Sequence, residues 1–259
     1  MSGPVIHDSG AGPALLLLHA FPLDASQWDG QVAALSDRYR CLRPDFWGCG
    51  TSPPPPGTVS VDSYARDVLG ALDGLGIDQF SVCGGSMGGY VAFALLRQAR
   101  DRVRSLVLAN TRATADSSDG RAARRAMAEE VRSGGVEAIV EPTTARMLCS
   151  RCRDEVHIAD PVRGRIRRCT TAGVVAALTA MAERPDSSEL LGGLDIPTLV
   201  VLGSADPVVP VEEARAVAAA IRGAALEEFS GSAHLTNLEQ PARFSQVVGD
   251  FLDAQVTPR

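Results

Sequence analysis

The sequence Gly-Gly-Ser-Met-Gly at residues 84–88 constrains the fold more than any other segment of the chain. Residues 80–83 precede it with the pattern of a short buried strand, and the apolar run at 90–96 is typical of a helix. A serine with Gly-x-Ser-x-Gly spacing between a strand and a helix lies on a sharp turn, where small neighbours keep its hydroxyl open to approach. We therefore predict that Ser86 is a nucleophile; a plain glycine-rich turn is the alternative.

A nucleophilic serine needs a base, because its hydroxyl must lose a proton as it attacks. The chain has four histidines, at positions 7, 19, 157 and 234. His234 follows the strand-like segment 225–229, so it belongs to a loop at the end of a late strand. We predict that His234 is this base, and an ordinary surface histidine is the alternative.

A carboxylate is expected to orient that histidine and to stabilise it when it becomes charged. The run Pro-Thr-Leu-Val-Val-Leu at 197–202 is typical of a strand buried on both faces, and Asp206 follows it in a loop. An aspartate before a proline is often only a turn residue. Together with Ser86 and His234, however, Asp206 is predicted to be the acid of a catalytic triad.

Two backbone amides are expected to stabilise the negative oxygen that forms when a carbonyl is attacked. One belongs to Met87, directly after the nucleophile. The other is predicted in the loop after the strand-like run 13–18, at Phe21. His19, in the same loop, is interpreted as a structural brace and not as a second base.

The chain resembles the α/β-hydrolase fold superfamily, and within it the 3-oxoadipate enol-lactonase-like esterases and lactonases. The resemblance covers nearly the whole chain and rests on segments 19–22, 45–52, 84–89, 109–113, 203–210 and 231–241. It implies the order nucleophile, acid, base along the chain, which Ser86, Asp206 and His234 follow. It is specific for the fold and the triad, and much less so for a substrate.

Three positions depart from the pattern of that family. Ala20 replaces a usual glycine in the loop of Phe21, and Trp47 replaces a usual arginine, which places an aromatic side chain near the predicted pocket. Asn110 stands where relatives often carry an aspartate, and some relatives supply the triad acid from that strand end. Because an asparagine cannot be a carboxylate, Asp206 is the better candidate.

Strand-like and helical segments alternate along most of the chain, which predicts a doubly wound, mostly parallel α/β sheet with helices on both faces. Strands are predicted at 5–7, 14–19, 41–45, 80–83, 105–109, 198–202 and 225–229, and helices at 28–35, 63–75, 90–98, 211–221 and 242–254. Between 111 and 197 only helical patterns occur, at 120–132, 136–148, 162–170 and 172–183. We predict a core of residues 1–111 and 197–259, and an inserted helical cap of residues 112–196.

A cap of this kind shapes the pocket and excludes water. Besides Trp47, the candidate lining residues are Met127, Ile139, Met147, Val174, Leu178 and Met181, although any of them could simply pack the cap onto the core. The segment 146–168 carries seven arginines and three acidic residues. These arginines could attract an anionic substrate, such as the acidic substrates of enol-lactonases, or form a solvated helix face.

Composition restricts the class of protein further. The 259 residues suit one large domain with or without an insertion, and the net charge of −6 provides no basic surface for nucleic acid. Residues 1–4 lack the pattern of a signal peptide, and no apolar run approaches 18 residues. We therefore predict a cytoplasmic protein with no nucleic-acid or membrane partner.

The six cysteines agree with a reducing compartment, where buried thiols act as small hydrophobic groups. Cys149 and Cys152 form a CxxC, and His157 and Cys169 follow it closely enough to suggest a zinc site. The loose spacing within a helical segment favours coincidence. We predict neither a metal nor a disulfide here.

These observations together predict a serine hydrolase that cleaves a small carboxylic ester or lactone through an acyl-enzyme on Ser86, without a cofactor. A cofactor-free perhydrolase or haloperoxidase and a carbon–carbon bond hydrolase would use the same triad. A non-hydrolytic ligand-binding or cyclising protein is an alternative of another class.

Overall fold

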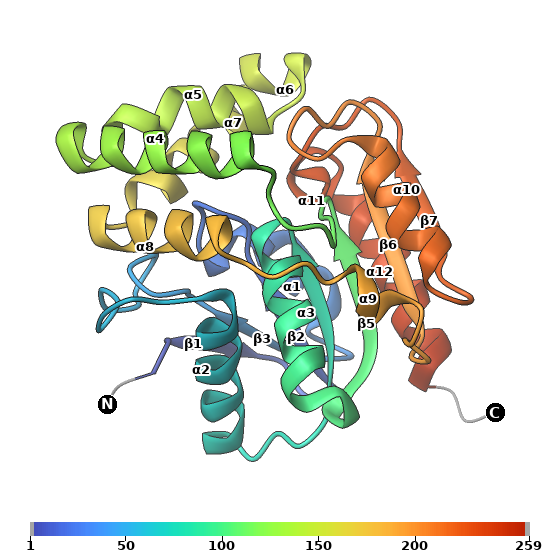
Figure 1. Cartoon of the computed structure of the whole chain (residues 1–259). Coiled ribbons are helices and arrows are strands. Elements are labelled where there is room, and N and C mark those ends of the chain that lie inside the picture. The colour runs from blue at the N-terminus through green and yellow to red at the C-terminus, as the bar shows by residue number, and fades with distance from the viewer. Residues whose placement is uncertain (1–2, 257–259) are drawn as a thin grey trace.

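The computed structural model describes residues 3–256, which form a central sheet of seven strands in the order β1-β3-β2-β4-β5-β6-β7 (Figure 1). Only β1 runs antiparallel to its neighbour. The strands are β1 (Ile6–Ser9), β2 (Ala14–Leu18), β3 (Arg40–Pro44), β4 (Phe80–Gly85), β5 (Val103–Ala109), β6 (Thr198–Gly203) and β7 (Ala225–Phe229). The prediction of a doubly wound, mostly parallel sheet is confirmed.

Strand β2 explains why the sheet is covered on both faces. Its side chains alternate between two hydrophobic clusters: Leu15 and Leu17 lie in one, and Leu16 and Leu18 lie in the other. All four are fully buried. A strand with both faces buried reads as an unbroken apolar run, which is the pattern of residues 15–18.

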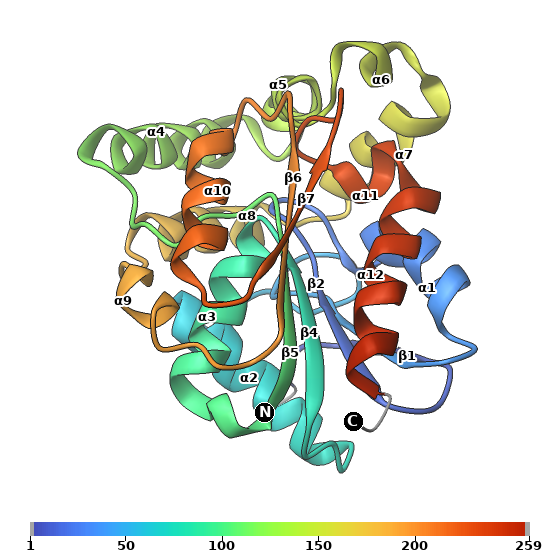
Figure 2. The same cartoon turned by 90° about the vertical axis from the view of Figure 1, so that its right-hand side faces the viewer.

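The helices of the core form one layer on each face of the sheet (Figure 2). Helices α1 (Asp29–Leu35) and α12 (Pro241–Val256) pack together on one face, where Trp28 and Phe244 fill the smaller cluster. Helices α2 (Val61–Gly74), α3 (Met87–Ala99) and α10 (Val211–Ala220) cover the other face. The short elements are η1 (Ala25–Trp28), η2 (Arg100–Arg102), α9 (Ser188–Leu191) and α11 (Thr236–Glu239).

Five further helices lie above the end of the sheet from which β4 and β5 run into their loops (Figure 1). They are α4 (Ser118–Gly134), α5 (Glu137–Met147), α6 (Ser150–Asp154), α7 (Val156–Arg167) and α8 (Thr171–Ala182). These five helices lie within the segment predicted to be a cap, and we refer to them as the cap. Helix α7 begins six residues before the predicted start at 162, and α6 was not predicted. Pro161 lies inside α7, within its first two turns.

The prediction that the cysteines are unpaired is wrong for four of them. The structure joins Cys49 to Cys169 and Cys149 to Cys152, whereas Cys41 and Cys83 are free and buried. Cys49 and Cys169 are 120 residues apart in sequence, so their spacing carried no signal of the pairing. Within residues 3–256 no helix is long and apolar enough to cross a membrane.

Candidate active site

Ser86 lies between β4 and α3 in a strained turn. Its φ of 51° is in the left-handed region, which a residue with a side chain rarely adopts. The turn also brings α3 against β2: a Cβ added to Gly88 would lie 2.2 Å from the carbonyl oxygen of Leu18. Only glycine fits at that position, which is the physical reason for the second glycine of the motif.

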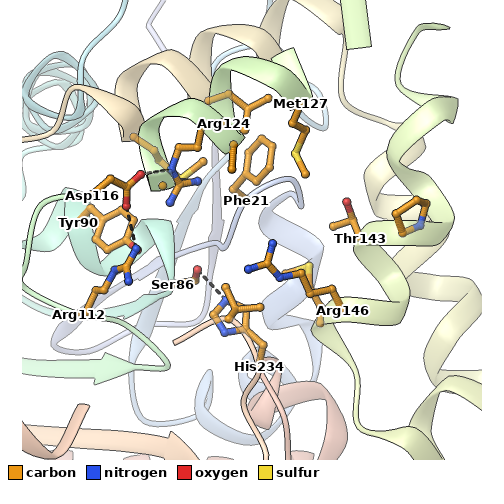
Figure 3. A pocket seen from close by; sticks show the side chains of 17 residues that line it. Phe21, Ser86, Tyr90, Arg112, Asp116, Arg124, Met127, Thr143, Arg146 and His234 are labelled. Atoms are coloured by element: carbon orange, nitrogen blue, oxygen red, sulfur yellow. Dashed lines mark hydrogen bonds and ion pairs between the residues drawn. The ribbon is translucent and has the colours of Figure 1, made fainter. Parts of the chain in front are cut away.

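His234 connects Ser86 to Asp206. Its Nε2 is 2.8 Å from Ser86 Oγ, and its Nδ1 is 2.8 Å from Asp206 Oδ2 (Figure 3 shows the pair Ser86–His234). The three side chains come from loops after β4, β6 and β7, whose carboxyl ends meet at one edge of the sheet. The structure thus brings the three residues of the predicted triad into one hydrogen-bonded chain.

Asp206 is held as a carboxylate by several donors. The amides of Val208 and Val209 donate to its Oδ1, at 2.8 and 3.1 Å, and Asn110 Nδ2 donates to Oδ2 at 3.0 Å. Burial alone would raise the pKa of Asp206, but His234 and the two amides hold this pKa below its ordinary value. Asn110, one of the departures from the family pattern, therefore contacts the acid from the neighbouring strand end.

Glu239 ties the loop of His234 to the segment that follows α5 in the cap, and sequence reasoning missed it. Its two carboxylate oxygens accept the amides of Ala233, at 2.7 Å, and of Cys149, at 2.8 Å. Beside it, the His234 amide donates to the Met147 carbonyl at 3.0 Å. Burial raises the pKa of Glu239. Glu239 lies three residues after the start of α11, but nothing in its sequence context indicated these two partners.

Two side chains hold the loop of Phe21 in place through hydrogen bonds. Gln27 Oε1 accepts the Ala20 amide at 2.7 Å, and His19 Nε2 accepts the Phe46 amide at 3.0 Å, which agrees with a bracing role for His19. Within residues 3–256, neither the Phe21 amide nor the Met87 amide has a hydrogen-bond partner. Both are the donors predicted for an oxyanion.

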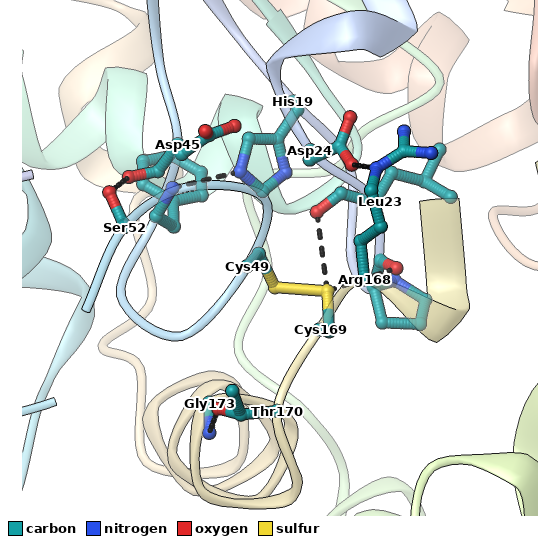
Figure 4. The surroundings of a disulfide bond; sticks show 12 residues. His19, Leu23, Asp24, Asp45, Cys49, Ser52, Arg168, Cys169, Thr170 and Gly173 are labelled. Carbon is teal, nitrogen blue, oxygen red and sulfur yellow. Dashed lines mark hydrogen bonds and ion pairs between the residues drawn. A yellow bond between two sulfur atoms is a disulfide. The ribbon is translucent and has the colours of Figure 1, made fainter. Parts of the chain in front are cut away.

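The cap is fastened to the same loop (Figure 4). The Sγ of Cys169 lies 3.5 Å from the Pro22 carbonyl oxygen, and Arg168 Nε donates to Asp24 Oδ2 at 2.7 Å. Next to the disulfide, Gly48 has a φ of 73°, and a Cβ added to it would lie 2.5 Å from the Cα of Gly173 in α8. Cap and core backbones therefore touch directly at this seam.

A cavity of about 290 Å³ lies between Ser86, His234 and the cap. Of the residues predicted to line it, Met127, Met147, Leu178 and Met181 do so, as does Phe21. Trp47 is a correction: it does not line this cavity, because it is buried and its indole donates to Asp67 at 2.8 Å. Ile139 and Val174 are buried in the hydrophobic core instead.

The wall of the cavity also carries charged residues that sequence reasoning did not single out. Asp116 is the centre of this group, and Arg112, Arg124 and Arg184 all pair with it. Its side chain is 1% exposed. Burial alone would raise the pKa of Asp116, but the surrounding guanidinium groups lower it to about 2. Arg112 also pairs with Glu213, at 3.1 Å.

Replacing Asp116 by asparagine is expected to lower the free energy of unfolding by about 2 kcal/mol at pH 7, which corresponds to the lowered pKa. Because the pKa is depressed in the folded protein, this stabilisation is full above about pH 4 and is lost as the pH falls toward 2. Urea unfolding of both proteins between pH 7 and pH 2.5 measures it. A difference that does not shrink with acid would contradict the assignment.

A family model described as the alpha/beta hydrolase fold matches residues 13–138. The chain is also 32% identical to 3-oxoadipate enol-lactonase 1 of Acinetobacter baylyi, over 93% of this chain and 88% of that protein. The chain belongs to the α/β-hydrolase fold family.

Two solved structures agree with this membership across almost the full length of the hydrolase. A thermophilic esterase from Thermogutta terrifontis, with malate bound, has a TM-score of 0.94 and 38% identity, covering 98% of this chain and 94% of its own. The enol-lactonase from Burkholderia xenovorans LB400 has a TM-score of 0.89 and 29% identity, covering 96% of each chain.

Proposed function

We propose that this protein is a serine hydrolase that cleaves a small carboxylic ester or lactone. The observation that carries the proposal is the chain from Ser86 through His234 to Asp206, with 2.8 Å at each step, opening on a cavity under the cap. Family membership supports hydrolysis in general, and the similarity to an enol-lactonase and an esterase supports esters and lactones as substrates.

In the proposed reaction, Ser86 Oγ attacks the substrate carbonyl while its proton moves to His234 Nε2. Asp206 accepts the hydrogen bond from Nδ1 and stabilises the imidazolium. The amides of Phe21 and Met87 donate to the oxygen that becomes negative; a single donor of this kind is worth about 3 kcal/mol in known hydrolases.

The tetrahedral intermediate then collapses. The bond between the carbonyl carbon and the leaving oxygen breaks, and His234 returns its proton to that oxygen, which leaves an acyl group on Ser86. A water molecule that loses its proton to His234 then attacks the acyl carbon. The bond from that carbon to Ser86 Oγ breaks, His234 returns the proton to Oγ, and the acid is released. In a lactone the leaving oxygen stays attached to the acyl chain.

The cap supplies the apolar side of the proposed substrate pocket. Met127, Met147, Leu178 and Met181 would contact the substrate, and a volume of about 290 Å³ restricts it to a small molecule. We assign residues 112–196 to this cap and residues 1–111 and 197–259 to the core.

A fluorophosphonate probe tests the nucleophile directly. We expect it to modify the protein once, at Ser86, as located by mass spectrometry of the tryptic peptides. Hydrolysis of p-nitrophenyl esters from acetate to octanoate then measures the acyl length that the cavity accepts. Modification at another serine, or no modification together with no ester hydrolysis, would refute the proposal.

A further inference from the structure

Arg146 differs from the other arginines of segment 146–168. Those others have partners outside the active-site cavity: Arg163 pairs with Glu141, Arg167 with Glu137, Arg151 with Glu155 and Arg168 with Asp24, while Arg165 donates to Ser26 and Arg153 to the Leu148 carbonyl. Most of the run is therefore a set of paired surface charges. Arg146 alone of these seven lines the cavity.

The guanidinium of Arg146 is also the unpaired one. Within residues 3–256 it has no ion-pair or hydrogen-bond partner, and its side chain is exposed. It extends from the last turn of α5 into the cavity, on the side where Ser86 and His234 lie (Figure 3). An arginine in this position offers several N–H donors that nothing in the protein uses.

The other charged residues around the cavity do not neutralise the positive charge of Arg146. Of the lining residues, Arg112 and Arg124 pair with Asp116. Behind this wall Arg184 also pairs with Asp116 and Glu213 with Arg112, so three positive charges meet two negative ones. Arg146 adds a further positive charge next to the nucleophile. A pocket with this surplus favours a ligand that brings its own negative charge.

We propose that Arg146 determines specificity by binding a carboxylate that the substrate carries in addition to its scissile ester or lactone group. Arginine suits this role because its planar fork pairs with both oxygens of a carboxylate. The proposal rests on the proposed hydrolase function and narrows its substrate class to anionic esters and lactones.

Matched pairs of substrates test it. Each pair consists of a monomethyl ester of succinate, glutarate or adipate and a neutral analogue in which a primary carboxamide replaces the free carboxylate. The two groups have nearly the same size and planar shape, so the ratio of their kcat/KM values measures recognition of the negative charge. In the wild-type protein we expect the anionic member of the best pair to be preferred at least tenfold.

Three variants assign that preference to one residue. Arg146→Gln is expected to lower the ratio by about tenfold to a hundredfold, the range for a lost charge-assisted hydrogen bond. Arg146→Lys keeps the positive charge but lacks the planar pair of N–H donors, so it should retain part of the preference for the anionic substrate. Arg167→Gln removes the same charge from the cap outside the cavity and should leave the ratio unchanged.

Two results would overturn this inference: a wild-type protein with no preference for the anionic members, or an unchanged ratio in Arg146→Gln. If the fluorophosphonate probe still modifies Ser86 and the neutral esters are hydrolysed, only the role of Arg146 is refuted. If no ester is hydrolysed and Ser86 is not modified, the proposed function fails, and the inference fails with it.

Discussion

Replacing Ser86 by alanine is expected to lower kcat by four to six orders of magnitude on whichever p-nitrophenyl ester the protein cleaves fastest. Alanine removes the oxygen that attacks the carbonyl, and nothing else among the cavity-lining residues is positioned against His234 Nε2. The loss should appear in kcat with little change in KM, because the cavity itself is unchanged. Steady-state hydrolysis with highly purified protein measures both constants.

Ser133→Ala provides the control for this variant. Ser133 is exposed near the end of α4, and its hydroxyl donates only to backbone carbonyls of its own helix. Its rates should equal those of the wild type. A Ser86→Ala protein that keeps its native circular dichroism and hydrolyses esters within tenfold of the wild-type rate would rule out Ser86 as the nucleophile.

Removing the disulfide between Cys49 and Cys169 is expected to have the largest effect on stability. The bond closes a loop of 120 residues, so replacing both cysteines by serine should lower the free energy of unfolding by about 5 kcal/mol. The stabilisation arises because the cross-link restricts the unfolded chain. Urea unfolding without reductant measures it, and a dithiol reductant should destabilise the wild type by at least as much, because it opens both disulfides.

The second disulfide is a matched control within the same chain. Cys149 and Cys152 are only three residues apart, so the same relation predicts about 2 kcal/mol for their replacement by serine. Serine also keeps the N-cap acceptor that Cys149 gives to the Cys152 amide. In the denatured, unreduced protein, only Cys41 and Cys83 should react with a thiol reagent. Six reactive thiols, or equal unfolding midpoints with and without reductant, would refute both pairings.

The strands and the triad were predictable because each has a local pattern. Residues 198–203 read as a strand because both faces are buried, and Ser86 was recognisable because its turn demands small neighbours on both sides. His234 and Asp206 could then be found by their order and by their place after strands. These signals need no knowledge of distant contacts.

The cap was less predictable because its contacts are made over long sequence distances. A helix was predicted from residue 162, directly after Pro161, yet α7 begins at Val156 and contains Pro161 in its second turn. Trp47 was assigned to the pocket from its sequence position alone, while its indole in fact meets Asp67 of α2. Arg146 looked like one of seven similar arginines until the partners of the other six were located.

The order of the strands determines where the chain could be divided into two fragments. Strands β6 and β7 lie together at one edge of the sheet, and the loops that follow them carry Asp206 and His234. Ser86 comes from a strand inside the remaining five. A break between α8 and β6 would therefore separate a fragment with the nucleophile from a fragment with the acid and the base. Fused to two interacting partners, such halves would regain hydrolysis only on reassembly, so this chain is divisible into a split reporter.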